Sequence, residues 1–77
     1  MGLFLEKTPE ITAYYKHFKG DVYQVLGLAK CSETTKTQVI YQNVATNEIW
    51  VRPNKEFLGK HPKHKVKRFE KIGGNNQ

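Results

Sequence analysis

The side chains best suited to chemistry form a basic run in the last third of the chain. Residues 55–71 hold seven Lys and Arg against two acidic residues, whereas residues 1–54 hold six against five. Such a run attracts phosphate groups, and each phosphate that it neutralises adds to the salt dependence of binding. Its excess of Lys over Arg favours unspecific phosphate attraction over bidentate base reading. The alternative is a solvated loop and a strand whose lysines protect a sheet edge. The basic candidates are Lys60, Lys63, Lys65, Lys67 and Arg68.

A second candidate site combines an aromatic ring with a guanidinium. Trp50 and Arg52 share one face of the run at residues 49–52, and if its two aliphatic residues face the core, Trp50 and Arg52 face outward together. A base or a peptide would stack on such a patch. The alternative is that Trp50 is the largest member of the core. The neighbouring strand offers two residues to complete the patch, Tyr41 and Gln42.

A third segment, residues 14–19, interleaves aromatic and basic residues as single-strand binders do. Its candidates are His17 and Lys19. The same spacing describes a half-buried strand in which His17 is structural.

Neither a metal site nor a catalytic set is expected. His61 and His64 have a spacing that suits zinc, but two more ligands would be needed and Pro62 disfavours a helix there. Cys31 with His17 has no motif that supports a nucleophile pair. We therefore expect a non-enzymatic protein without metal or cofactor.

Short β-rich runs separated by turns must position these side chains. Gly27 within the second run predicts a bulge, and Asn54 is the expected N-cap of one helical turn. This order predicts a mainly β fold, a small SH3-like β-barrel of about five strands. The expected strands are 15–18, 22–29, 37–43, 49–52 and 66–72, with the last one starting late or bulged and the helical turn at 54–58.

The domain itself is expected at residues 14–72. Residues 1–13 predict an N-terminal arm that docks on the body or stays loose, and Thr8-Pro9-Glu10 would also suit a helix start. Residues 73–77 predict a flexible tail.

Length and composition narrow the class of protein. The chain has 77 residues, a net charge of +6, and 38% hydrophobic and 26% charged residues, which predicts one small folded domain. A single Cys excludes an internal disulfide, and no apolar run approaches a membrane span. A cytoplasmic location is therefore the default expectation. The charge favours an acidic or nucleic-acid partner.

Six short motifs follow one another along the chain: Tyr15-Lys16-His17-Phe18-Lys19-Gly20, Tyr23-x-Val25-Leu26-Gly27-x-Ala29, Ser32-Glu33-Thr34, Val39-x-Tyr41-Gln42, Trp50-Val51-Arg52-Pro53 and Arg68-Phe69. Over roughly residues 14–72 they resemble the small, mainly bacterial domain of unknown function 1653 family. The resemblance implies a compact β-rich, SH3-like domain and no established activity. Cys31 stands where the family more usually has His or Asp, which argues against a functional role for it.

The leading hypothesis is a module that binds nucleic acid through the basic run, with stacking on Trp50 and a fork from Arg52. The alternative is a protein-interaction module that holds a peptide or a partner chain in an aromatic groove. A third, weaker class is a small enzyme or ligand binder that uses His17 and Arg52. The sequence predicts no oligomeric state.

Overall fold

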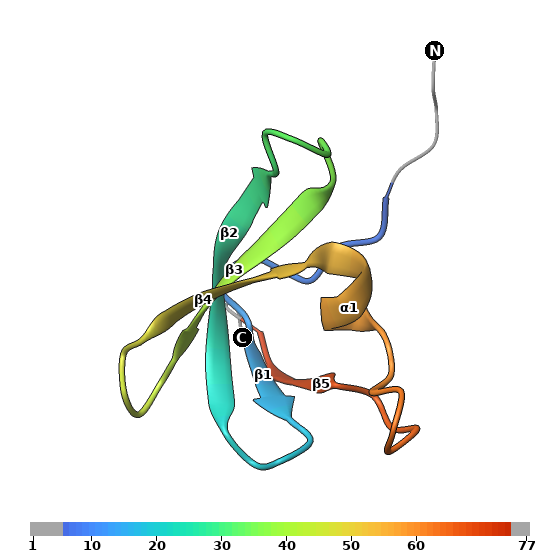
Figure 1. Ribbon diagram of the computed structural model, residues 1–77. Coiled ribbons are helices and arrows are strands. Elements are labelled where there is room, and N and C mark those ends of the chain that lie inside the picture. Colours follow the sequence, from blue (N-terminus) through green and yellow to red (C-terminus); the bar gives the residue numbers. More distant parts are fainter. Residues whose placement is uncertain (1–5, 75–77) are drawn as a thin grey trace.

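The computed structural model describes residues 6–74, which form one antiparallel sheet and one short helix (Figure 1). The mainly β class with five strands and one helical turn, expected from the sequence, is confirmed. The elements are β1 (Tyr14–His17), β2 (Val22–Lys30), β3 (Thr37–Asn43), β4 (Ile49–Pro53), α1 (Asn54–Leu58) and β5 (Phe69–Gly73).

The sheet has the order β4-β3-β2-β1-β5, so the first four strands are neighbours in sequence and β5 returns to pair with β1. In residues 6–74, β4 and β5 are the two edges and do not pair with each other. The sheet is therefore twisted but open (Figure 1), and the closure that a barrel requires is not observed. The SH3-like barrel stays a prediction.

Aromatic rings and β-branched side chains form the core between the sheet and α1. Phe57 of α1 stacks on Phe69 with ring centroids 4.1 Å apart, and Tyr41 meets both rings edge-on. Alternate residues of each strand face one side of a sheet, which explains why buried and half-buried positions alternate along β3 from Val39 onward. The buried apolar residues are Ala13, Tyr15, Val25, Val39, Tyr41, Phe57 and Phe69.

Two local irregularities shape the strands. The register of β2 against β3 shifts between Val25 and Gly27, which confirms the bulge predicted at Gly27. β5 begins only at Phe69 and runs to Gly73, so the last strand starts late and reaches one residue into the expected tail. An isolated bridge between Lys60 and Lys67 precedes it.

Three loops share one turn geometry, at residues 31–36, 43–48 and 61–66. In each loop the first residue accepts a hydrogen bond from the fifth N–H and donates its own N–H to the sixth C=O. The fifth residue has a left-handed backbone, with φ of 59°, 67° and 60° in the three loops. Type I turns closed by one left-handed residue are common in short hairpins, so local chemistry suffices to form these loops.

The first side chain of each of these loops caps the turn. Asn43 Oδ1 accepts hydrogen bonds from the N–H groups two and three residues on, at 2.8 and 3.0 Å. His61 Nδ1 does the same at 3.1 and 3.3 Å. The Cys31 thiol receives hydrogen bonds from the Thr34 hydroxyl and from the backbone of Thr34 and Glu33, which lowers the pKa of Cys31. Capping of the turns therefore accounts for Cys31 and His61 without a role in metal binding or nucleophilic chemistry.

Asn54 has a different role from the expected one. The residue before α1 is Pro53, and no side chain caps the helix. Asn54 Nδ2 instead donates to Glu6 Oε2 (3.1 Å) and to the Lys7 carbonyl (2.7 Å), while Asn54 Oδ1 is buried without a partner in the described residues. The Asn54 side chain points toward the N-terminal segment because the two acceptors of its Nδ2 group, on Glu6 and Lys7, lie there.

The segment at residues 6–13 lies against the body without forming a helix. Thr12 N donates to the Val25 carbonyl (2.8 Å), and Val25 N donates to the Ala13 carbonyl (3.0 Å). Lys71 also pairs with Glu10. The remainder of the expected arm, residues 1–5, and of the expected tail, residues 75–77, lies outside the described residues. Within residues 6–74, no helix has the length and apolar character needed to cross a membrane.

Candidate anion-binding site

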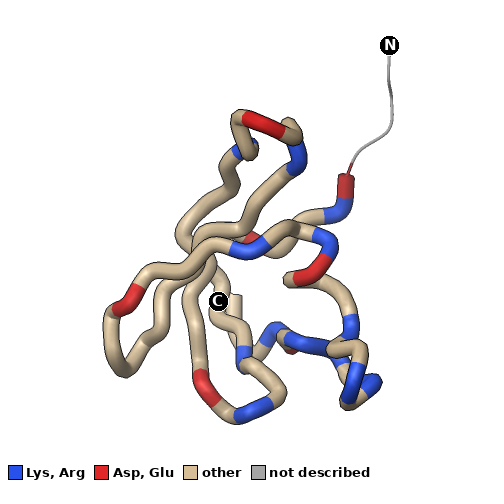
Figure 2. Tube along the Cα trace, in the orientation of Figure 1, with Lys and Arg blue, Asp and Glu red and all other residues tan. Residues whose placement is uncertain are grey.

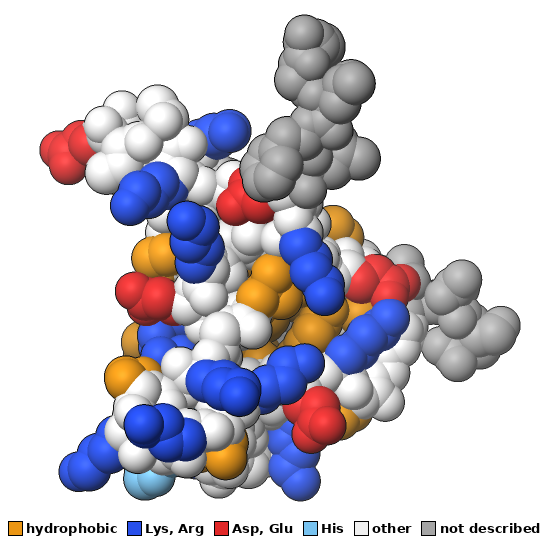
Figure 3. All heavy atoms as spheres, turned by 90° about the vertical axis from the view of Figure 1, so that its right-hand side faces the viewer, with side chains coloured by type: hydrophobic (Ala, Val, Ile, Leu, Met, Phe, Trp, Pro, Cys, Tyr) orange, Lys and Arg blue, Asp and Glu red, His pale blue; other side chains and the backbone are white. Residues whose placement is uncertain are grey.

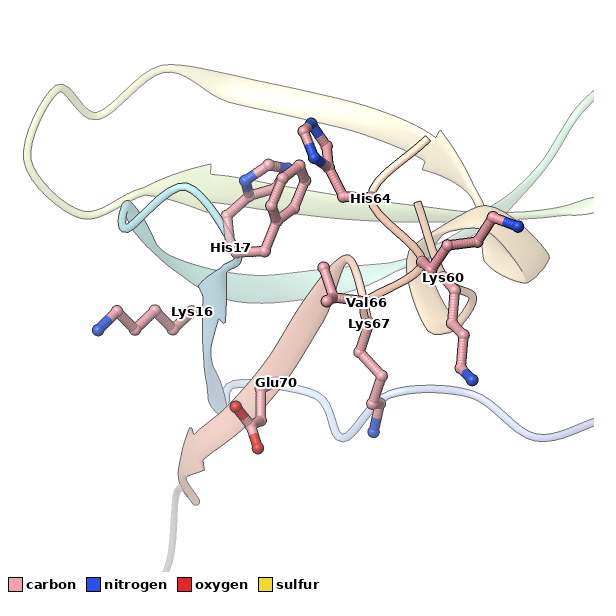
Figure 4. A pocket seen from close by; sticks show the side chains of 9 residues that line it. Lys16, His17, Lys60, His64, Val66, Lys67 and Glu70 are labelled. Atoms are coloured by element: carbon pink, nitrogen blue, oxygen red, sulfur yellow. The ribbon is translucent and has the colours of Figure 1, made fainter. Parts of the chain in front are cut away.

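An open cavity of about 800 Å³ lies between β1, the start of β5 and the loop at 60–67 (Figure 4). Four lysines and two histidines line it, and Glu70 is the one acidic residue among the nine described lining residues. Figure 2 shows this loop as the most densely basic stretch of the chain, and in Figure 3 Lys and Arg side chains are spread over the visible face, its lower part included. The lining residues are Lys16, His17, Phe18, Lys60, His64, Lys65, Val66, Lys67 and Glu70.

Strand pairing brings this set together from the two ends of the chain. Lys16 of β1 lies opposite Glu70 of β5, and the Lys60–Lys67 bridge holds the base of the loop. The His61 cap then fixes the loop beyond that bridge. The backbone therefore positions the lysines, while their long side chains remain adjustable.

The lysines surround the cavity instead of converging within it. In Figure 4 Lys16, Lys60 and Lys67 extend in different directions, and the rings of His17 and His64 lie on the opposite side from Lys67 and Glu70. Separated ammonium groups suit several charges spaced along a chain better than one compact anion. Lysine acts on phosphate as a point charge and does not need a fixed geometry.

Phe18 is the centre of the aromatic side of the cavity. Its ring centroid lies 4.5 Å from that of His17, 5.0 Å from His61 and 5.1 Å from His64. The Lys19 ammonium lies 6.0 Å from the Phe18 centroid. Aromatic faces bordered by cations are the surfaces on which bases of single-stranded nucleic acids stack.

Both structural histidines of this cluster resist protonation. Partial burial, then Arg52, Arg68 and Lys19, lowers the pKa of His17 below its usual 6.5. Partial burial and the neighbouring His64 and Arg68 likewise lower the pKa of His61. His17 Nδ1 also accepts a hydrogen bond from Lys19 N (3.1 Å). The lowered pKa values of His17 and His61 disfavour their charged forms, so the positive charge of the site does not depend on these two rings.

The two candidate arginines are held by α1 and by the core. Arg68 Nε donates to the Glu56 carbonyl (3.2 Å), and Arg52 Nη1 donates to Glu56 Oε1 (3.2 Å). Arg52 Nε also donates to Tyr41 Oη (3.3 Å). Two of the three nitrogens of the Arg52 guanidinium are therefore engaged within the protein, so the predicted fork is not free to bind a ligand with both Nε and Nη1. Lys63 is exposed at the tip of the loop, outside the cavity lining.

The expected patch around Trp50 is assembled differently. Ile49 and Val51 are 61% and 62% exposed, so the predicted inward orientation of these two side chains is wrong. Trp50 pairs with Tyr41, whose inward direction puts Trp50 on the same face, where it remains 50% exposed at the sheet edge. Tyr41 is itself buried, and Gln42, one position on, lies on the opposite face. The structure thus separates these residues from the basic cavity's lining.

Lys16, Phe18 and His64 complete the site but were not among the candidates. Phe18 and Lys16 flank His17 in the sequence, so their interleaving was visible, whereas the pairing of β1 with β5 that brings them to the basic loop was not. The sequence indicates His64 only as a candidate metal ligand. In residues 6–74 the structure contains no group of three or more His, Cys, Asp or Glu side chains arranged to hold a metal.

The comparisons with known proteins place the chain in a family. The model described as "Protein of unknown function (DUF1653)" matches residues 13–71, so the chain belongs to this family. A crystal structure of a DUF1653 protein from Bordetella bronchiseptica is similar, with a TM-score of 0.69 and 25% identity over 86% of this chain and 91% of that chain. No curated protein matches the chain significantly.

Proposed function

We propose that this protein is a non-enzymatic module that binds single-stranded nucleic acid at the basic cavity. The observation that carries the proposal is the ring of Lys16, Lys60, Lys65 and Lys67 around a cavity whose other side is the Phe18 aromatic cluster. Phosphates would lie along the lysines and a base would stack on the exposed His64 ring. The stacking surface in this proposal is the Phe18 cluster and not Trp50.

An SH3-like relationship belongs to the same proposal. The sheet curls around α1, and one helical turn precedes the last strand, as in small β-barrels that bind ligands between their loops. Here the ligand would lie beside the loop before β5.

The test compares two triple variants with equal net charge. Lys60→Gln/Lys65→Gln/Lys67→Gln removes lysines of the cavity, whereas Lys7→Gln/Lys30→Gln/Lys36→Gln removes three exposed lysines outside it. Binding of a labelled mixed-sequence oligonucleotide is followed by fluorescence anisotropy between about 50 and 200 mM salt. Each lost phosphate contact lowers the slope of log K against log salt by about 0.7, so the cavity variant should lose about 2 from the slope.

His64→Ala separates stacking from charge. We expect weaker binding at an unchanged salt slope, because stacking on an aromatic face contributes about 1–3 kcal/mol per base without counterion release. Equal losses in the two triple variants, or no binding by the wild type at low salt, would show that the cavity is not the site.

The peptide-binding alternative gives a different result in the same assay. A proline-rich peptide would bind in an aromatic groove with little salt dependence, and Trp50→Ala would abolish this binding. Binding of that kind, with no response to the oligonucleotide, would favour the protein-interaction module.

A further inference from the structure

The two edges of the sheet differ in how they are protected. Edge strands of monomeric proteins normally carry charges that prevent pairing with another chain. β5 has Glu70 and Lys71 within it, whereas β4 exposes three consecutive large apolar residues, Ile49, Trp50 and Val51. In residues 6–74 no strand pairs with the outer side of β4. This edge is therefore open to a further strand.

The phase of the β3–β4 ladder shows which backbone groups are available. Antiparallel neighbours alternate between residue pairs that exchange both hydrogen bonds and pairs that exchange none. The bond from Asn43 N to the Glu48 carbonyl sets this phase, so every second residue of β4 from Glu48 onward bonds to β3. Ile49 and Val51 lie between and direct their N–H and C=O groups outward. Pro53, next in phase, offers only a carbonyl.

We propose that β4 pairs in antiparallel fashion with β4 of a second copy of this chain, with Trp50 opposite Trp50. In this register Ile49 lies opposite Val51 of the second copy, and Val51 opposite Ile49. All N–H and C=O groups of these two residues are then paired in both copies. Pro53 lies beyond the last bond, where its missing N–H costs nothing.

Charge selects both the occupant and the register. With Trp50 opposite Trp50, Glu48 of each copy lies opposite Arg52 of the other, and opposite charges on facing residues stabilise a strand pair. In the described residues the contacts of Arg52 use Nε and Nη1, which leaves Nη2 for this carboxylate. The next register, with Val51 opposite Val51, would place Glu48 opposite Asn54 and would require an N–H from Pro53.

The facing tryptophans add the apolar part of the contact. Trp50 would form a non-hydrogen-bonded pair with its copy, and such pairs have the closest side chains in an antiparallel sheet. Aromatic pairs at these positions are favourable. The half-exposed Trp50 ring would thus be covered by the same ring of the second copy.

The first experiment measures mass by sedimentation velocity from about 0.01 to 1 mM protein, without nucleic acid. We expect a monomer–dimer equilibrium that Val51→Lys abolishes, because it puts a charge on the open edge. The matched control is Ile72→Lys, which replaces an exposed apolar residue of β5 and should leave the dimer unchanged. A wild type that stays monomeric up to 1 mM, or a dimer that persists in Val51→Lys, overturns the proposal.

The second experiment tests the register by exchanging charges. Glu48→Arg alone and Arg52→Glu alone each place like charges opposite each other in a homodimer, so each should be monomeric. An equal mixture restores both ion pairs and should form a heterodimer. Circular dichroism verifies that each variant is folded. If Arg52→Glu does not fold, Glu48→Arg is mixed with wild type instead. The homodimer of Glu48→Arg has two like-charge contacts and the mixed dimer has one, so the mixed dimer should have the higher affinity. The absence of rescue or of this ranking refutes the register.

Failure here is distinguishable from failure of the proposed function. Lys60→Gln/Lys65→Gln/Lys67→Gln should keep the dimer while losing nucleic acid, and Val51→Lys should do the reverse. In the dimer, salt screens both the Glu48–Arg52 ion pairs and the net repulsion between the two copies, so salt should change the affinity of the dimer little. Salt should weaken nucleic-acid binding steeply.

Discussion

Replacing Asn43 by Ala should remove the cap of the β3–β4 hairpin. Asn43 is buried, and its Oδ1 accepts two backbone hydrogen bonds at 2.8 and 3.0 Å. Each lost hydrogen bond costs about 1 kcal/mol, so the free energy of unfolding should fall by about 2 kcal/mol. In a domain of this size, 1 kcal/mol shifts Tm by about 4–8 °C, which predicts a decrease of about 8–16 °C.

Thermal and urea unfolding followed by far-UV circular dichroism would measure this loss. Asn43→Asp keeps the acceptor oxygen, so it should lose at most half of the free energy of unfolding that Asn43→Ala loses. Val44→Ala changes an exposed residue of the same loop and should stay within about 0.5 kcal/mol of the wild type. If Asn43→Ala costs less than about 0.5 kcal/mol, or if Asn43→Asp costs as much as Asn43→Ala, the side-chain cap does not stabilise this turn.

The other two predictions concern the His61 loop and Gly59. The pKa of His61 is lowered from its usual 6.5, so the unfolded chain binds more protons than the folded chain as the pH falls below 6.5, and the 61–66 loop should loosen there. His61→Asn should remove this pH dependence, which amide exchange at Lys63 would measure. The same pH dependence in the wild type and in His61→Asn would argue against the His61 cap. Gly59→Ala should cost about 1–3 kcal/mol in urea unfolding, because a Cβ would lie 2.8 Å from the Lys55 carbonyl oxygen, whereas Gly27→Ala meets no atom within 4 Å and should be neutral or stabilising. Similar stabilities of these two variants would contradict the steric argument.

Features that depend on local sequence were predictable. The bulge near Gly27 follows from a residue that acts on its immediate neighbours, and the strand ranges follow from β-rich runs between turns. The helical turn forms at 54–58 as predicted, although Asn54 does not cap it. The basic loop was likewise visible as a run of lysines. The backbone conformation of each of these segments depends little on the rest of the fold.

Features that depend on distant partners were not predictable. The side on which Trp50 lies is set by its pairing with Tyr41, since β3 and not β4 decides which face is inward. Asn54 satisfies the usual pattern of an N-cap, yet it binds Glu6 and Lys7 because the N-terminal segment returns to α1. Whether five strands close into a barrel depends on twist and stagger, for which a single sequence has no marker.

The return of β5 to β1 also orders the events of folding. The first four strands join through short local loops, which close quickly, whereas β1 and β5 must meet from opposite ends of the chain, so we expect their pairing to form last. The meander of β1–β4 can therefore form before the basic cavity exists. A ligand that contacts both Lys16 and Lys67 would hold β1 and the segment before β5 together. It would slow the separation of β1 from β5 more than the opening of any of the hairpins.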